Sequence, residues 1–137
     1  MGSEMCIRDS VIIADSEDEL DFIKVRRANI ALFLYHEQLL KFSNLVANDA
    51  KVFIDETFIK ELPAGINWVV YRAPYTKVAE SKLGTPRVAN MVALGHLIGV
   101  TKLVPEEAIE RSIDALVREE WRDINKRAFR LGLSLSK

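Results

Sequence analysis

Apolar runs separated by a helical pattern predict an α/β arrangement in the first half of the chain. The stretch 28–35 is almost continuously apolar, which is typical of a parallel strand covered on both faces. Residues 36–47 repeat apolar side chains at helical spacing, and 50–55 is a second apolar run. Together these three segments predict a strand, a helix and a strand with a right-handed crossover. Shorter apolar runs predict two further strands at 11–14 and 68–72.

The second half of the chain is predicted to be helical. Residues 77–83 predict a short helix that Gly84 ends, and Pro86 suits the first turn of the next helix, which runs to about 101. A final helical pattern begins at 105, restarts within the polar stretch 118–123 and continues to Gly132. This part of the sequence contains no strand pattern, so we expect a helical C-terminal third.

The helix predicted to begin at Pro86 is apolar around most of its circumference, which indicates deep burial. Gly95 and Gly99 lie four residues apart and form a ridge of small residues that suits close approach of another backbone. Asn90 is a polar exception on this helix. Because an unsatisfied buried amide costs about 1–3 kcal/mol, we expect Asn90 to hydrogen-bond a loop.

The order of elements predicts an α/β fold, a three-layer α/β/α sandwich with a mostly parallel sheet. We expect one domain over 11–137, because 137 residues is a usual domain length. Residues 1–10 lack periodicity and are expected to be a non-native or unstructured leader, so Cys6 is left out of the functional argument. No Gly-rich phosphate loop precedes the first secure strand, and we expect the sheet to be incomplete on its N-terminal side.

Composition narrows the functional classes. The chain has 19 Lys and Arg against 20 Asp and Glu, and this balance argues against nucleic-acid binding. Its 49% hydrophobic content argues against disorder. The longest apolar stretch, 88–104, is interrupted by polar residues and falls short of the roughly 20 apolar residues that span a bilayer. No secretory signal is present in the sequence, so we expect a cytoplasmic protein without a membrane partner.

Carboxylates after two predicted strands suggest a receiver-like acidic pocket as an alternative. In such a domain, carboxylates at adjacent strand ends hold Mg²⁺ around one nucleophilic Asp. The residues concerned are Asp15, Glu17, Asp18, Asp21 and Asp55. A solvated acidic turn explains them more simply, since surface carboxylates are the norm. The alternative function is therefore a free-standing signalling or small-ligand-binding α/β module.

Other candidate groups also have ordinary structural interpretations. The single Cys and two His residues make a structural zinc site improbable. His36 suits a helix N-terminus, whereas His96 sits among apolar residues and is expected to be partly buried and neutral. A basic face near the C-terminus suits an acidic partner or a solvated surface; it comprises Arg122, Lys126, Arg127 and Arg130.

Two positions are the best site candidates. The turn formed by Pro74, Tyr75 and Thr76 directly follows a predicted strand, where α/β folds bind ligands and partners. The other is Asn90, whose amide needs a hydrogen-bonding partner if it is buried. Both positions are also compatible with purely structural roles.

Several segments resemble the gamma subunit of 2-oxoacid:ferredoxin oxidoreductases. The most specific is Arg87–Gly95, which is similar to the family pattern V-A-N-M-V-x-L-G. Val11–Phe22 resembles the family's V-I-I-S-D-E-E-I-D-F segment, and Pro74–Gly84 resembles its P-A-T-x-x-A-x-x-x-L-G helix. Asn125–Gly132 matches N-x-x-A-F-x-x-G. The resemblance covers roughly residues 11–133. The form of Ala89–Val92 is closer to 2-oxoglutarate or branched-chain members than to pyruvate members.

The resemblance implies a non-catalytic subunit of a complex that oxidatively decarboxylates a 2-oxoacid to its acyl-CoA and reduces ferredoxin, with 2-oxoglutarate as the expected 2-oxoacid. It places thiamine diphosphate, iron–sulfur clusters and CoA in partner subunits: alpha, beta and a ferredoxin-like subunit. The family's Gly-rich G-x-G-G-Q-G loop would precede Val11, so we expect a partial gamma-type domain. We expect no catalytic, cofactor-binding or metal-binding residue in this chain. Possible subunit contacts are Pro74, Tyr75, Thr76 and Asn90.

Overall fold

The computed structural model describes residues 4–6, 11–14 and 28–136. It divides into two compact units, Met1–Ala73 and Pro74–Lys137, where the sequence predicts a single domain. Each unit has apolar core residues of its own, and for this reason the division falls between the last strand and the first helix that follows it. None of the described helices is long and apolar enough to span a membrane.

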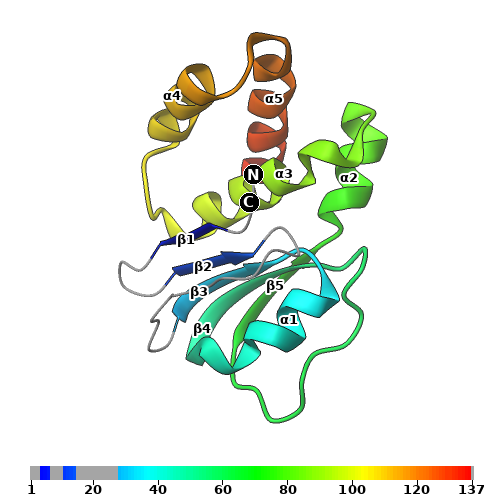
Figure 1. The fold of residues 1–137 in the computed structure, drawn as a ribbon, viewed down its shortest axis with the longest axis vertical. Coiled ribbons are helices and arrows are strands. Elements are labelled where there is room, and N and C mark those ends of the chain that lie inside the picture. Colours follow the sequence, from blue (N-terminus) through cyan, green and yellow to red (C-terminus); the bar gives the residue numbers. More distant parts are fainter. Residues whose placement is uncertain (1–3, 7–10, 15–27, 137) are drawn as a thin grey trace. The chain divides into compact units, whose positions relative to one another are not determined.

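A five-stranded sheet forms the first unit (Figure 1). Its order follows the chain, β1 and β2 pair antiparallel, and every other neighbouring pair is parallel. The strands are β1 (Glu4–Cys6), β2 (Val11–Ala14), β3 (Ala28–Phe33), β4 (Val46–Asp55) and β5 (Val69–Ala73). β1 lies within residues 1–10, which the sequence analysis expects to be a non-native or unstructured leader, and it pairs with β2.

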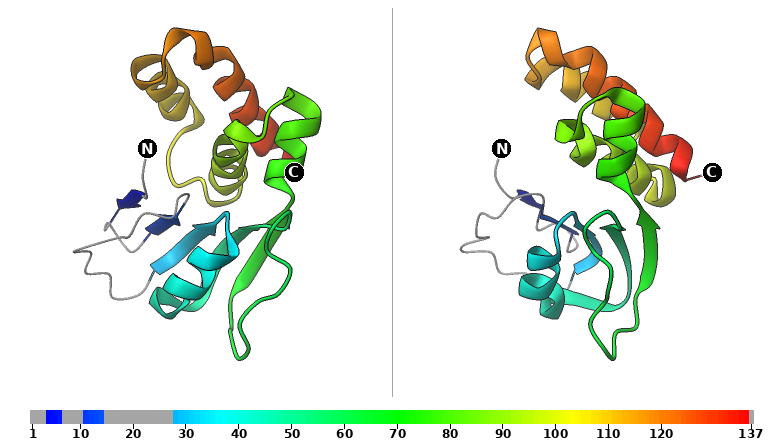
Figure 2. Two further views of the ribbon diagram at one scale, coloured as in Figure 1. Left: turned by 45° about the vertical axis from the view of Figure 1, so that its right-hand side comes forward. Right: turned by 90° about the vertical axis from the view of Figure 1, so that its right-hand side faces the viewer.

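Helix α1 (His36–Phe42) covers one face of this sheet (Figures 1 and 2). The predicted helix over 36–47 is too long, because a short 3-10 turn at Ser43–Leu45 follows α1 and leads into β4. Alternate strand residues and two helix residues form the apolar core on this face; the main members are Ala31, Phe33, Val52, Ile54, Leu39 and Phe42. The strand–helix–strand prediction is otherwise confirmed, with β3 and β4 parallel.

β4 begins four residues earlier than the sequence predicts because it contains a bulge. The register with β3 shifts between Ala28 and Ile30. Within the bulge, Asp49 has a φ of 65°, which a short polar side chain tolerates better than most residues. The Asp49 backbone N–H donates to the Asn67 carbonyl at 2.6 Å, and Asn67 Nδ2 donates to Asp49 Oδ1 at 3.2 Å. Residues 48 and 49, which separate the predicted helix from the predicted strand, therefore belong to a bulge inside β4.

The second unit is helical, as predicted. Its helices are α2 (Tyr75–Leu83), α3 (Ala89–Thr101), α4 (Glu106–Leu116) and α5 (Glu119–Leu135), with a 3-10 turn at Pro86–Val88 before α3. Gly84 ends α2 at a φ of 81°, a left-handed conformation that glycine adopts without strain. The α/β class, the mostly parallel sheet and the helical C-terminal third are thus confirmed.

Helices α3 and α5 pack side by side at three glycines (Figure 2). A Cβ added to Gly95 would lie 2.9 Å from the Gly132 Cα and would collide with the Phe129 carbonyl oxygen. A Cβ on Gly132 would collide with the Val92 carbonyl oxygen in return. The predicted ridge is thereby confirmed at Gly95. Gly132, expected to end the last helix, is instead an internal packing residue of α5.

Candidate functional site

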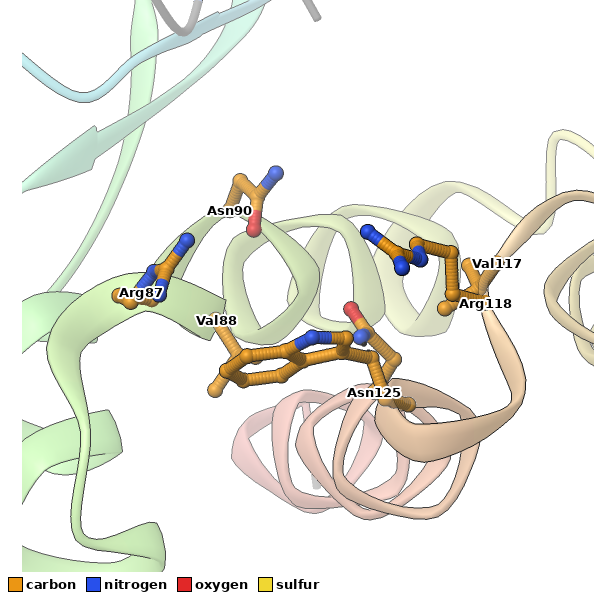
Figure 3. A pocket seen from close by; sticks show the side chains of 7 residues that line it. Arg87, Val88, Asn90, Val117, Arg118 and Asn125 are labelled. Atoms are coloured by element: carbon orange, nitrogen blue, oxygen red, sulfur yellow. Dashed lines mark hydrogen bonds between the residues drawn. The ribbon is translucent and has the colours of Figure 1, made fainter.

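A cavity of about 280 Å³ lies within the second unit, between the start of α3 and the start of α5 (Figure 3). Asn90 is one of its lining residues and is the one that the sequence singled out. In Figure 3 the Arg118 guanidinium and the side-chain amides of Asn90 and Asn125 point toward this space. The full lining consists of Arg87, Val88, Asn90, Val117, Arg118, Trp121 and Asn125.

Two arginines and one indole determine the chemistry of this pocket. Arg87 follows Thr85, whose Oγ1 accepts from the Arg87 backbone N–H at 3.1 Å and begins the turn before α3. The Arg87 guanidinium lies over the Trp121 ring, 5.0 Å from its centroid, in a cation–π contact. Arg118 directly precedes α5 and its side chain is 82% exposed. Of the residues that the structure describes, no acid lines the pocket, and the two arginines give its lining a positive charge.

Asn90 is half-buried in the pocket wall, and its amide makes no hydrogen bond with any residue that the structure describes. The expected bond to a loop is thus not formed within the described part of the chain. Seven residues of α3 are buried and the other six, Asn90 included, are half-buried, so no residue of this helix is fully exposed. The sequence analysis did not select four of the lining residues as site candidates: Arg87, Arg118, Trp121 and Asn125. They are up to 38 positions apart, and no local pattern shows that α3 and α5 bring them together.

The three residues of the Pro74–Thr76 turn differ in burial. Pro74 and Thr76 are half-buried, at the start of α2. Tyr75 is fully buried, and its hydroxyl lies 2.7 Å from His96 Nδ1, a buried hydrogen bond between α2 and α3. The Tyr75 side chain is therefore part of the interior of this unit.

His96 is buried, where the sequence predicts a partly buried histidine. Only 5% of its surface is exposed, and burial lowers its pKa from the ordinary value, because desolvation disfavours the charged ring. The Tyr75 ring meets the imidazole edge-on, with 5.7 Å between centroids. Burial and the tyrosine partner indicate a structural role for this histidine.

The acidic residues of the receiver-like alternative fall in two groups. Asp15, Glu17, Asp18 and Asp21 lie outside the described residues. Asp55, at the end of β4, is fully buried, and its Oδ1 accepts from the Thr57 backbone N–H at 2.9 Å. A phosphoacceptor carboxylate must be reached by its phosphodonor, so this burial does not favour the alternative.

Two residues of the basic face of α5 form ion pairs with acids of the same unit. Lys126 lies 2.6 Å from Asp114, and Arg130 Nη2 lies 2.8 Å from Glu110; both acids belong to α4. The hydrogen bond and charge of Glu110 raise the pKa of Arg130. These residues therefore fasten α4 to α5, a third possibility beside the two that the sequence suggested.

The chain's own residues do not fit the iron–sulfur clusters that the resemblance assigns to partner subunits. Such clusters are held by several cysteine thiolates, and Cys6 is the only cysteine in the sequence. Among the described residues, His, Cys, Asp and Glu form no group of three or more that could hold a metal ion.

Comparison with known proteins gives a family. Residues 8–135 match the model of the pyruvate ferredoxin/flavodoxin oxidoreductase family. The chain belongs to this family. The matched range covers most of both units, so the membership applies to nearly the whole sequence.

Relatives with curated names include two 2-oxoglutarate synthase subunits KorC. The one from Methanothermobacter marburgensis is 32% identical over 133 residues, which is 93% of this chain and 70% of the relative. The one from Methanocaldococcus jannaschii is 28% identical over 132 residues, which is 95% of this chain and 69% of the relative. Both alignments run through the two units of the structure.

A solved structure shares the fold. It is the gamma subunit of a keto/oxoacid ferredoxin oxidoreductase from Geobacter sulfurreducens PCA, with a TM-score of 0.75 and 27% identity. The match covers 80% of this chain and 64% of that subunit. The chain thus spans roughly two-thirds of the lengths of the proteins that it matches.

Proposed function

We propose that this chain is a non-catalytic gamma subunit of a 2-oxoacid:ferredoxin oxidoreductase. The complex would convert a 2-oxoacid, 2-oxoglutarate by preference, to its acyl-CoA with reduction of ferredoxin. The observation that carries the proposal is the match to a solved gamma subunit of such an oxidoreductase with a TM-score of 0.75. The preference for 2-oxoglutarate rests on the names of the curated relatives.

The proposed role is structural, and the chemistry belongs to the partners. Thiamine diphosphate, iron–sulfur clusters and CoA are assigned to alpha, beta and ferredoxin-like subunits. In this chain the buried histidine is bonded to a tyrosine, and the only cysteine is Cys6. These features support a subunit that contributes surface and rigidity to the complex.

The proposed contact surface contains Pro74, Thr76 and Asn90. All three are partly exposed and lie at the N-terminal ends of α2 and α3. Tyr75 contributes indirectly, because its buried bond to His96 ties the start of α2 to α3. We therefore assign the contact to the flanking residues and the positioning of this end of the unit to Tyr75.

Co-purification tests the proposed function. This chain, carrying an affinity tag, is co-expressed with the thiamine diphosphate-binding and ferredoxin-like subunits of the oxidoreductase from the same source. We expect these subunits to co-elute with it, and 2-oxoglutarate-dependent ferredoxin reduction to appear in the complex. Elution of the tagged chain alone, with full activity in the fraction that lacks it, would contradict the proposal.

A charge placed in the proposed contact tests the surface itself. We expect Thr76→Arg to reduce co-elution at least tenfold, because an interface without a matching acid leaves the guanidinium desolvated and unpaired. Ser81→Arg, an exposed position on the same helix, is the matched control and is expected to co-elute normally. Circular dichroism establishes that both variants fold. Equal co-elution of the two variants would exclude Thr76 from the interface.

A further inference from the structure

We propose that the outer edge of β5 pairs with β5 of a second copy of this chain, with the two strands antiparallel about a two-fold axis. β5 is the last strand in the sheet order, and among the described strands it has a neighbour on one side only, β4 (Figure 1). An outermost strand presents a row of N–H and C=O groups that can pair with another chain. The inference does not depend on the proposed function, because it uses residues of the first unit alone.

The hydrogen bonds between β4 and β5 determine which backbone groups of β5 face outward. The Glu56 backbone N–H donates to the Ala73 carbonyl at 3.0 Å, so Ala73 directs its backbone groups toward β4. In a parallel ladder every second residue of a strand does the same. Tyr71 therefore also faces β4 with its backbone groups, whereas Val70 and Arg72 direct their N–H and C=O groups to the outer edge.

A two-fold axis at Tyr71 brings these outward groups opposite one another. In an antiparallel ladder, residues that exchange both N–H···O bonds lie directly opposite and alternate with residues that exchange none. Val70 of each copy then exchanges its two bonds with Arg72 of the other copy. The strand can therefore pair with itself in a register that satisfies the backbone groups of both residues.

The aromatic side chains of the sheet suit a second copy of β5 as the occupant. Tyr71 is half-buried and stacks on Phe53 of β4, with 4.7 Å between the ring centroids and 12° between the planes. This distance matches the spacing of neighbouring strands. Self-pairing places the two Tyr71 rings directly opposite, where the side chains of an antiparallel pair approach most closely. Such aromatic pairs stabilise a sheet, and here the pair would extend the existing stack.

Charge and apolar surface also fit this register. Arg72 is exposed, and in this register its stem covers Val70 of the other copy. Like charges directly opposite would destabilise the pair, but the two Arg72 residues are only diagonal neighbours. Val69, which is 47% exposed, lies opposite Ala73 of the other copy. Because two strands of 5 residues make a small contact, we expect a weak dimer whose population rises with protein concentration.

Sedimentation equilibrium and amide hydrogen exchange of the whole chain test this pairing together. We expect a monomer–dimer equilibrium, and exchange of the Val70 and Arg72 amides that slows as the protein concentration rises. The Tyr71 amide faces β4 and is the internal control, so its exchange should change far less. A monomer at every concentration would overturn the proposal, as would a dimer that leaves the Val70 and Arg72 amides unprotected.

Two variants of one residue isolate the backbone contact. Arg72→Pro removes an outward N–H and leaves the bonds to β4 in place, as edge strands permit. It should weaken dimerisation about tenfold or more, because two symmetry-related hydrogen bonds are lost. Arg72→Ala removes the same side chain but keeps the N–H, so it is the matched control and should still dimerise. Circular dichroism establishes that both variants fold.

Equal dimerisation of the two Arg72 variants would refute the pairing. The other possible occupant of this edge is an extended strand of a partner subunit. A monomeric parent, together with loss of co-eluting subunits in Arg72→Pro but not in Arg72→Ala, would assign the edge to that partner strand and reject the second copy.

Discussion

Tyr75 and His96 show how one residue pair ties two helices together. The tyrosine is fully buried at the start of α2, and the histidine lies on the buried face of α3. Their 2.7 Å hydrogen bond satisfies two polar groups that would each be costly to bury alone. The burial that this arrangement requires also lowers the pKa of His96.

This lowered pKa predicts how the stability of the second unit depends on pH. In the unfolded chain a histidine has a pKa of about 6.5, whereas folded His96 takes up its proton only at lower pH. The unfolded state therefore binds more protons below about pH 6.5. We expect the free energy of unfolding to be independent of this group above that pH, and to fall as the pH drops from there to the folded pKa. Urea denaturation at a series of pH values measures it.

Two variants isolate the histidine term from the many carboxylates of the chain. His96→Asn should lack the decline that the parent shows as the pH falls through 6.5. Tyr75→Phe keeps the titrating ring and should retain a pH-dependent decline, at a stability lower by about 1–3 kcal/mol, because it leaves a buried ring nitrogen without its partner. An identical pH profile for the parent and His96→Asn would refute this account.

Among the elements, the crossing of α3 and α5 depends on glycine. Gly95 and Gly132 face each other across it, so that backbone meets backbone. Each glycine costs helix propensity of about 1 kcal/mol, which the close packing of the two helices offsets. Gly99 is different, since an added Cβ there would meet the side chain of Ser136, one residue beyond α5.

Alanine substitution should therefore affect these glycines unequally. We expect Gly95→Ala and Gly132→Ala each to lower the free energy of unfolding by about 1–3 kcal/mol or more, because the new methyl collides with backbone atoms that cannot move independently. Gly99→Ala should cost clearly less, since Ser136 lies at the end of its helix and can shift. Chemical denaturation of the three variants measures the difference. Equal losses at all three positions would show that the contact with backbone is not the cause.

At the scale of the whole molecule, the chain consists of two units with separate interiors. The core under α1 contains residues of the first unit only, with Trp68 packed against it. In the second unit, Phe129, Leu97 and Val92 are fully buried on α3 and α5. Each unit thus contains one tryptophan that reports on it, Trp68 or Trp121.

The two tryptophans allow a test of whether destabilising one unit also destabilises the other. In the Trp68→Phe background, fluorescence follows the second unit through Trp121, and in the Trp121→Phe background it follows the first unit through Trp68. We expect Gly95→Ala to lower the urea midpoint reported by Trp121 clearly more than the midpoint reported by Trp68, because the collision lies within the second unit. Equal shifts of both midpoints would show that the two units unfold as one cooperative body.

The sequence alone predicts most helices and strands but does not predict the residues of the cavity. The strand at 11–14, a strand beginning at 28 and the helix end at Gly84 follow local rules and were predicted, and the helix predicted to begin at 105 begins at Glu106. The early start of β4 was not, because Asp49 adopts a positive φ within a bulge that depends on Asn67, far along the chain. The cavity was not predicted either, since its residues come from two helices.

The sequence determined the element types, the buried nature of α3 and the family, because each depends on residues close together along the chain or on a motif such as Arg87–Gly95. Only the tertiary structure decided that Gly132 meets Gly95, that Tyr75 turns inward to His96, and that Arg87 and Arg118 line one cavity. The physical reason is the same in all three cases. Contacts between helices depend on how their faces pack, and periodicity defines a face without naming the partner that covers it.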